Sequence, residues 1–272
     1  IWGGEILLVD YKAFQRFGCI TPFLQIGGDA SSREGWRIAV SMLYGQLKDR
    51  EAAMEMIGKL GLCSEQDAKV QMTMADRKIN AVMSTSAGRL FDGVSAILGI
   101  RKASTFEGEA SMALEFAAEA YEKKYQNAVD LQNVTDEMRK QFSLAACIDN
   151  KESESAESNK PEQVKAVLNT GTLVKAIAEA RIAGEDTEKL AYFFHWILAE
   201  EIIAACQKAR KESGRGTAAL SGGVFQNQLL LKMVDEGLQK EGFKVLKHSL
   251  VPPNDGGIAL GQAVYAMGFL KS

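Results

Sequence analysis

Residues 217–227 read TAALSGGVFQN, and this stretch decides the fold. The short run 217–220 has the character of a buried strand, and it ends in a turn that contains two glycines. A helix is predicted over 224–240 and a second strand over 243–249. Strands that are joined through a helix lie parallel in one sheet, so the pattern predicts an α/β fold.

The turn Ser221-Gly222-Gly223 is a candidate ligand site. Two adjacent glycines allow backbone N–H groups to approach a ligand, and the N-terminus of the following helix favours an anion such as phosphate. The same glycines can serve a tight strand-to-helix turn that binds nothing. The turn is neither a Walker P-loop nor a dinucleotide fingerprint, so those two enzyme classes are not supported.

The loop 252–257, PPNDGG, follows the second strand and presents Asp255 where that strand ends. Ligands of open α/β sheets bind on this side, and a carboxylate there can hold a metal ion. The alternative is that Asn254 and Asp255 only cap the last helix, which is predicted over 258–270.

Upstream of this region, strands are expected first and helices afterwards. Residues 5–9 and 14–26 have strand character, and residues 10–12 can join them as a hairpin. In the long stretch that follows, apolar side chains recur at helical spacing. The predicted helices span 36–48, 51–60, 67–83, 86–99, 109–125, 163 or 173 to 182, and 186–213.

A third candidate site lies at the start of the helix predicted from Ser86. Arg89 and Asp92 are three residues apart and therefore share a helix face. Asp92 can accept hydrogen bonds from ribose hydroxyls, and Arg89 can bind phosphate. The alternative is an ordinary surface ion pair, which contributes little to stability.

Composition narrows the classes of function. The chain has 272 residues and a formal charge of −3, without the basic excess of a general nucleic-acid binder. No apolar run reaches the length of a membrane span. The cysteines stand singly, without a disulfide or zinc-ribbon pattern, so we expect reduced thiols in a cytoplasmic protein. They are Cys19, Cys63, Cys147 and Cys206.

The two histidines do not form a metal site by themselves. His195 lies in an apolar helix beside Phe194 and Trp196, and it is interpreted as a core residue; His248 is distant in sequence.

The chain begins at Ile1 without a methionine and enters a strand-like run almost at once. We therefore expect it to be a fragment of a longer protein.

Several motifs together resemble one family, the HypF-type carbamoyltransferases of nickel–iron hydrogenase maturation. The resemblance covers nearly the whole chain and is to the carboxyl-terminal part of the family. Its tRNA-modifying relative TsaD has shorter equivalents of these motifs. The motifs are WGGE at 2–5, TSAGRLFD at 85–92, EGEA at 107–110, FH at 194–195, LSGGVFQN at 220–227 and PNDGG at 253–257.

The resemblance implies a partial actin-like, ATP-binding domain built from ribonuclease-H-like halves, with a large helical insertion. It implies a strand hairpin over 1–29, a helical insertion over 30–149 that carries part of the nucleotide site, and the rest of the half over 164–272. The intervening segment 150–163, NKESESAESNKPEQ, contains no large apolar residue, so a mobile loop is expected there.

The activity implied by the resemblance is carbamoyl transfer. Family members use carbamoyl phosphate and ATP, form carbamoyl adenylate, and carbamoylate the carboxyl-terminal cysteine of HypE, which leads to the cyanide ligand of the hydrogenase. By motif match, Asp92 and the turn Glu107-Gly108 would face ribose and adenine. Gly222, Gly223 and Asn227 would face phosphate and adenosine, and Asp255 would bind a divalent metal such as zinc, iron or magnesium.

Family features are also missing from the sequence. The histidine-rich metal motif, the first strand of the sheet and the adenylate-forming domain all lie upstream in the family. We therefore expect an incomplete metal site, a sheet with a gap at its centre that a homodimer could fill, and no full reaction by this chain alone. Two alternatives remain: a TsaD-like transferase acting on tRNA, and an inert module that binds ATP or docks HypE.

Overall fold

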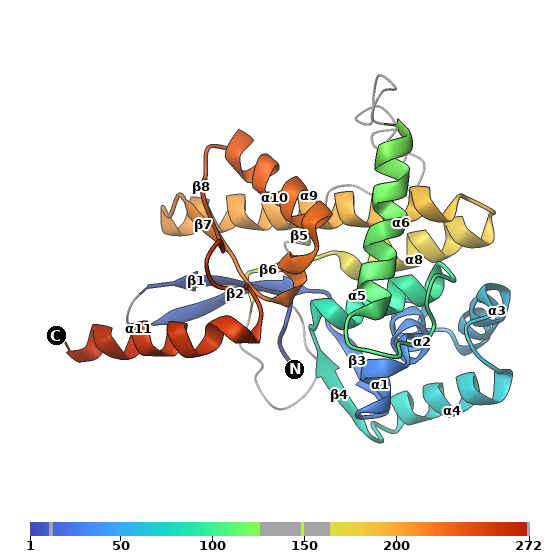
Figure 1. Ribbon diagram of the computed structural model, residues 1–272. Helices are drawn as coiled ribbons and strands as arrows, with labels where there is room; N and C mark the ends of the chain where they lie inside the picture. Colours follow the sequence, from blue (N-terminus) through green and yellow to red (C-terminus); the bar gives the residue numbers. More distant parts are fainter. Residues whose placement is uncertain (11–12, 126–147, 150–163, 271–272) are drawn as a thin grey trace. The chain divides into compact units, whose positions relative to one another are not determined.

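The computed structural model describes residues 1–10, 13–125, 148–149 and 164–270 (Figure 1). The chain divides into two compact units, each assembled from three separate stretches. The first unit comprises Ile1–Gly3, Ile20–Ala146 and Asn169–Leu198, and the second comprises Gly4–Cys19, Cys147–Leu168 and Ala199–Ser272. Both units therefore contain parts of the segments expected at 1–29, 30–149 and 164–272. The loop expected at 150–163 lies outside the described residues.

The first unit is built around helix α2 (Gly35–Leu47), which packs against α5 (Ala87–Ile97) and strand β3 (Phe23–Ile26). Gly93 allows the two helices to approach closely, because a Cβ atom there would overlap the Met42 side chain. Ser86 caps α5 by accepting a hydrogen bond from the Arg89 amide. The predicted helix therefore starts within one residue of the expected position.

The other helices of this unit surround that centre. They are α1 (Ala30–Arg33), α3 (Arg50–Leu60), α4 (Glu65–Asp76), α6 (Glu109–Tyr125) and α8 (Thr170–Ile182), while α9 (Thr187–Ser213) continues into the second unit. Most of the predicted helices are confirmed to within a few residues. Asp49 and Ser64 cap α3 and α4 by accepting backbone hydrogen bonds three residues ahead.

One helix prediction in this unit is wrong at its C-terminal end. The helix expected over 67–83 ends at Asp76, and Ala81–Ser84 form strand β4, antiparallel to β3. Lys78 and Asn80 adopt positive φ angles between the two elements, so the helix cannot continue through them. Pairing with β3, which is distant in sequence, decides the conformation of a segment whose local pattern also suits a helix.

The second unit contains the predicted hairpin, of strands β1 (Glu5–Val9) and β2 (Phe14–Ile20). The strand expected over 14–26 is divided, because β2 ends at Ile20 and β3 pairs with β4 in a different sheet. The sheet order is β1-β2-β6-β5, and β6 (Ala166–Leu168) pairs with the two-residue strand β5 (Ile148–Asp149). Strand β6 was not predicted, and it excludes a helix starting at 163. Phe17, Ala166 and Ala209 form a small core behind this sheet.

The strand–helix–strand pattern predicted over 217–249 is also confirmed in this unit. Strand β7 (Thr217–Leu220) lies parallel to β8 (Lys244–Lys247), and α10 (Gln228–Lys240) joins them. Two details differ from the prediction. The helix expected from Val224 begins instead as a 3-10 turn, η1 (Gly223–Gln226), and β8 is shorter than 243–249.

The described chain ends with a second 3-10 turn, η2 (Asp255–Gly257), and helix α11 (Ile258–Leu270). Helix α11 contains no charged residue, and several of its large side chains are exposed, among them Leu260 and Val264. None of the described helices combines the length and the hydropathy needed to cross a membrane.

Candidate functional site

Asp92 is the most unusual of the predicted site residues. It lies on α5 and is only 3% exposed. The Ser111 hydroxyl donates a long hydrogen bond of 3.5 Å to Oδ1. Arg89 Nη2 lies 2.9 Å from Oδ2, close enough for an ion pair but outside hydrogen-bond geometry. Within the described part of the chain, Oδ2 is thus a buried acceptor without a hydrogen bond.

Burial also changes the acidity of this carboxyl group. Loss of solvation raises the pKa of Asp92 to about 6, against the opposing influence of the Arg89 guanidinium and the Ser111 hydroxyl. A buried acceptor without a donor destabilises a folded protein, so such groups commonly serve a ligand or a reaction. The surface ion pair considered as an alternative does not describe this site, because both partners are largely buried.

The turn Glu107-Gly108 immediately precedes helix α6, whose first turn contacts Asp92. Gly108 has a φ angle of +80°, which favours glycine, and helix α6 starts at the next residue. Ser111, in the first turn of α6, provides the hydroxyl that contacts Asp92. The Glu107 side chain is exposed, and a role of this turn toward adenine stays a prediction.

The second unit brings together the two glycine loops. The Gly222 amide donates a hydrogen bond of 2.8 Å to the Pro253 carbonyl, so the turn after β7 contacts the loop after β8. Gly222 has a φ angle of +100°, and no atom lies within 4 Å of a Cβ placed there with ideal geometry. A Cβ at Gly223 would meet only the Gln226 side chain, at 3.8 Å. The turn is therefore open enough for a ligand to approach its backbone.

Asn227 has a structural task that the sequence did not reveal. It is buried, and its Oδ1 accepts a hydrogen bond of 2.8 Å from the Leu230 amide, which caps α10. The start of α10 is therefore occupied by a side chain of the protein. This cap alone explains an asparagine here, and its role toward adenosine stays a prediction.

A pair that sequence reasoning missed lies beside the same turn. His248 Nε2 is 2.9 Å from the Ser221 hydroxyl oxygen. The two residues are far apart in sequence, but Leu220 pairs with Lys247 in the parallel register of β7 and β8. The residues that follow these partners are therefore level with each other, and the register is the signal that would have found the pair.

Asp255 does not complete a metal site with the residues that the structure describes. Within them, no group of three or more His, Cys, Asp or Glu side chains is arranged to hold a metal ion. Asn254 accepts a hydrogen bond of 3.1 Å from the Gly256 amide, so it caps the 3-10 turn η2, which leads into the last helix. One carboxylate is too few ligands for a tight site.

His195 is confirmed as a core residue. Its side chain is fully buried, its Nδ1 lies 2.8 Å from the Ala191 carbonyl, and its ring meets the Phe91 and Phe194 rings edge-on. Burial lowers its pKa to about 4, so the imidazole is neutral near pH 7.

Comparison with known proteins gives a consistent match. Residues 1–262 match the family model described as "Carbamoyltransferase, Kae1-like Domain, second subdomain". The chain is 33% identical over 273 residues to the carbamoyltransferase HypF of Rhodobacter capsulatus, covering 100% of this chain and 31% of that protein. It is 28% identical over 264 residues to the probable carbamoyltransferase HypF of Methanocaldococcus jannaschii, covering 97% of this chain and 30% of that protein.

Solved structures agree on the fold. A full-length HypF in a phosphate- and nucleotide-bound form superposes with a TM-score of 0.76 at 28% identity, over 100% of this chain and 31% of that one. The HypF of T. kodakarensis gives a TM-score of 0.72 at 23% identity, over 99% of this chain and 32% of that one. The predicted α/β fold class is confirmed, and the chain spans about a third of the length of the relatives it matches.

Proposed function

The chain belongs to the HypF carbamoyltransferase family, and on that premise we propose that it supplies the adenine-nucleotide-binding part of such an enzyme. The reaction proposed for the longer protein uses carbamoyl phosphate and ATP, proceeds through carbamoyl adenylate, and carbamoylates the carboxyl-terminal cysteine of HypE. The product serves the cyanide ligand of a hydrogenase. Because the chain spans about a third of its relatives' length, we propose that it is inactive alone.

The observation that carries the proposal is the buried acceptor of Asp92. Its Oδ2 is desolvated and lacks a hydrogen bond within the described residues, and a ribose hydroxyl is a donor of the right kind. The adjoining turn Glu107-Gly108 would contact the adenine. A relative 28% identical to this chain was solved with phosphate and nucleotide bound, which supports the same class of ligand here.

The turn at Gly222 and Gly223 is proposed to contact the phosphates through its backbone, with Asn227 nearby holding the start of α10 in place. Asp255 is proposed to give one carboxylate to a divalent metal whose other ligands lie outside the described residues. No step of the reaction is derived through that metal, because the residues present do not complete its site.

The proposal is tested by titration calorimetry of the purified chain with ATP. Asp92→Ala removes the ribose acceptor and should weaken ATP binding by about 1–3 kcal/mol, the range for a lost buried hydrogen bond. Ser95→Ala is the matched control, because Ser95 lies one turn further on α5 and its hydroxyl is also buried without a hydrogen bond. Equal affinities in Asp92→Ala and the parent chain would refute the ribose assignment.

A second titration separates the enzyme part from the docking module considered above. The chain is titrated with HypE instead of ATP. HypE binding without ATP binding would favour the inert docking module.

A tRNA-modifying role is not favoured, because the relatives reported above are named HypF and the formal charge is −3. A cytoplasmic location is part of the proposal and agrees with the singly spaced cysteines.

A further inference from the structure

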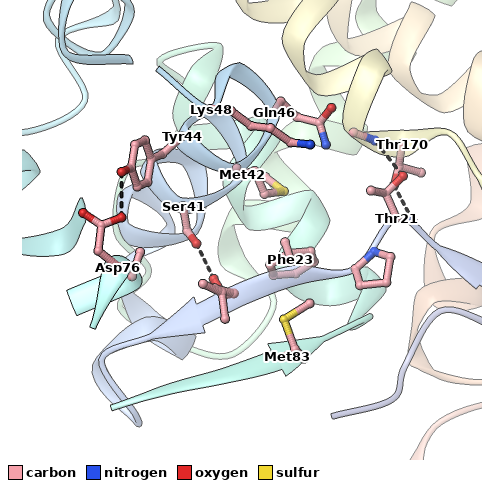
Figure 2. Close-up of a pocket in the computed structure, with 15 residues that line it drawn as sticks. Thr21, Phe23, Ser41, Met42, Tyr44, Gln46, Lys48, Asp76, Met83 and Thr170 are labelled. Atoms are coloured by element: carbon pink, nitrogen blue, oxygen red, sulfur yellow. Dashed lines mark hydrogen bonds between the residues drawn. The ribbon is translucent and has the colours of Figure 1, made fainter. Parts of the chain in front are cut away.

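A pocket of about 450 Å³ lies in the first unit, where the C-terminal end of α2 faces strand β3, the end of α4 and the start of α8 (Figure 2). Pockets that bind small molecules commonly fall in the range of about 300–1,000 Å³. Asp92, Glu107 and Gly108 are not among the residues that line it. The pocket is therefore separate from the residues proposed above to bind nucleotide.

The pocket has an apolar part and a polar part. Phe23, Met42 and Met83 provide apolar surface, and Met83 is half exposed on β4. At one end, the Tyr44 hydroxyl donates a hydrogen bond of 2.7 Å to Asp76 Oδ1, as Figure 2 shows. The other oxygen of Asp76 lies 2.9 Å from Arg50, so the charge of this carboxylate is already compensated.

Lys48, an exposed residue, supplies a positive charge to the pocket. Figure 2 shows its side chain at the pocket, which Gln46 also lines. Within the described chain, no carboxylate lies within ion-pair distance of its ammonium group. Lys48 is also the C-cap of α2 with a φ angle of +52°, a conformation that glycine adopts more easily.

The N-terminus of α8 adds a favourable field. Thr170 and Gly171, the first residues of this 13-residue helix, line the pocket. The Gly171 amide donates a hydrogen bond of 3.1 Å to the Thr21 hydroxyl, and the Thr172 amide donates one of 3.4 Å to Asn169 Oδ1, so the helix contributes the field of its dipole and not free N–H donors. Gly171 leaves room for Gln46, whose amide would overlap a Cβ atom there. The polar groups that converge on this end of the pocket therefore suit a negative group.

We propose that this pocket binds a small organic anion. The apolar body of the ligand lies over Phe23, Met42 and Met83, and its carboxylate or phosphate meets Lys48 and the Gln46 amide. This site does not depend on the proposed nucleotide site, and nothing in the family match assigns it.

The site is tested with two probes that differ in charge, 2-naphthoate and the neutral 2-naphthamide, by fluorescence or ligand-observed NMR titration of the whole chain. Naphthoate should bind about two- to fivefold more tightly, the effect of one ion pair at an exposed lysine. Lys48→Gln should lower naphthoate affinity to that of naphthamide. Lys69→Gln is the control, because Lys69 pairs with Glu65 and does not line the pocket.

A second variant blocks the pocket without threatening the fold. Gly45 is an exposed glycine on α2 that lines the pocket, and no atom lies within 4 Å of a Cβ placed there. Gly45→Leu replaces a helical glycine, so stability should not fall, while the new side chain fills the mouth. Gly58→Leu on α3 is the matched control, because Gly58 is equally open and away from the pocket.

Naphthoate binding that is lost in Gly45→Leu and kept in Gly58→Leu supports the site. Equal binding in the parent chain and Gly45→Leu would overturn it, as would equal affinity for the two probes. Binding of neither probe to the parent chain also overturns the proposal. ATP titration of Gly45→Leu should be unchanged, which keeps this result distinct from a failure of the nucleotide proposal.

Discussion

Asp92 and His195 are two buried ionisable residues whose acidities are shifted in opposite directions. Burial raises the pKa of Asp92 from 3.8 to about 6, and it lowers the pKa of His195 from 6.5 to about 4. Between pH 4 and 6 the folded protein therefore holds a proton on Asp92 that the unfolded chain lacks. The unfolded chain holds a proton on His195 that the folded protein lacks. The effects of these two residues on the free energy of unfolding therefore oppose each other between pH 4 and 6.

The two contributions to stability have opposite pH dependences. The contribution of Asp92 is present below pH 4 and is lost as pH rises through 6, while that of His195 is present above pH 6.5 and is lost as pH falls through 4. Each shift is worth about 3 kcal/mol at 1.36 kcal/mol per pKa unit. We expect these two contributions nearly to cancel in the parent chain.

Single substitutions should unmask each contribution. In Asp92→Asn, the free energy of unfolding should drop by about 2–3 kcal/mol relative to the parent chain as pH is lowered from 7 to 4. In His195→Asn it should rise relative to the parent chain over the same interval. Urea unfolding at several pH values measures both. Parallel pH profiles for the parent chain and both variants would contradict the two shifts.

At the scale of elements, the turn between β7 and η1 depends on one of its two glycines more than on the other. Gly222 has a φ angle of +100°, which strains any other residue, whereas a Cβ at Gly223 meets only an ordinary contact. Gly222→Ala should lower the free energy of unfolding by about 1–3 kcal/mol. Gly223→Ala should leave stability nearly unchanged.

The same pair of glycines tests the ligand role of the turn. Because Gly223→Val places a branched side chain at the backbone proposed to meet phosphate, it should weaken ATP binding even though the fold is retained. Urea unfolding and ATP calorimetry are measured on each variant. If Gly223→Val is folded and binds ATP as the parent chain does, the turn does not contact the phosphates.

At the scale of the whole molecule, helix α11 leaves several large apolar side chains exposed. It contains no charged residue, and Leu260 and Val264 are each more than half exposed. Large exposed apolar patches favour association with another protein surface. We expect the purified chain to self-associate, which agrees with the homodimer considered from the sequence.

Light scattering over a range of concentrations tests this expectation. Leu260→Lys with Val264→Lys should lower the average mass toward that of a monomer. The control is Lys59→Gln on α3, an exposed position whose partner is Glu55 on the same helix. A parent chain that stays monomeric at all concentrations would show that α11 does not mediate self-association.

The amino-acid sequence by itself determined the features that depend on near neighbours. Patterns a few residues long predicted the start of α5 near Ser86, the hairpin of β1 and β2, and the parallel pair β7 and β8 with its connecting helix. The order of the motifs also predicted the HypF family, which the comparisons confirmed. These features are local because backbone capping and hydrophobic periodicity act within single elements.

Only the tertiary structure decided the features that need distant partners. Strand β4 replaces the end of a predicted helix because β3 pairs with it, and Ser221 meets His248 because two strands share a register. Among the described residues, Asp92 Oδ2 accepts no hydrogen bond, and burial of the carboxyl group on α5 raises its pKa. No sequence pattern reveals this loss of solvation. Strand pairing and loss of water are set by residues far apart in sequence, and this is why folding had to bring them together before the site could be recognised.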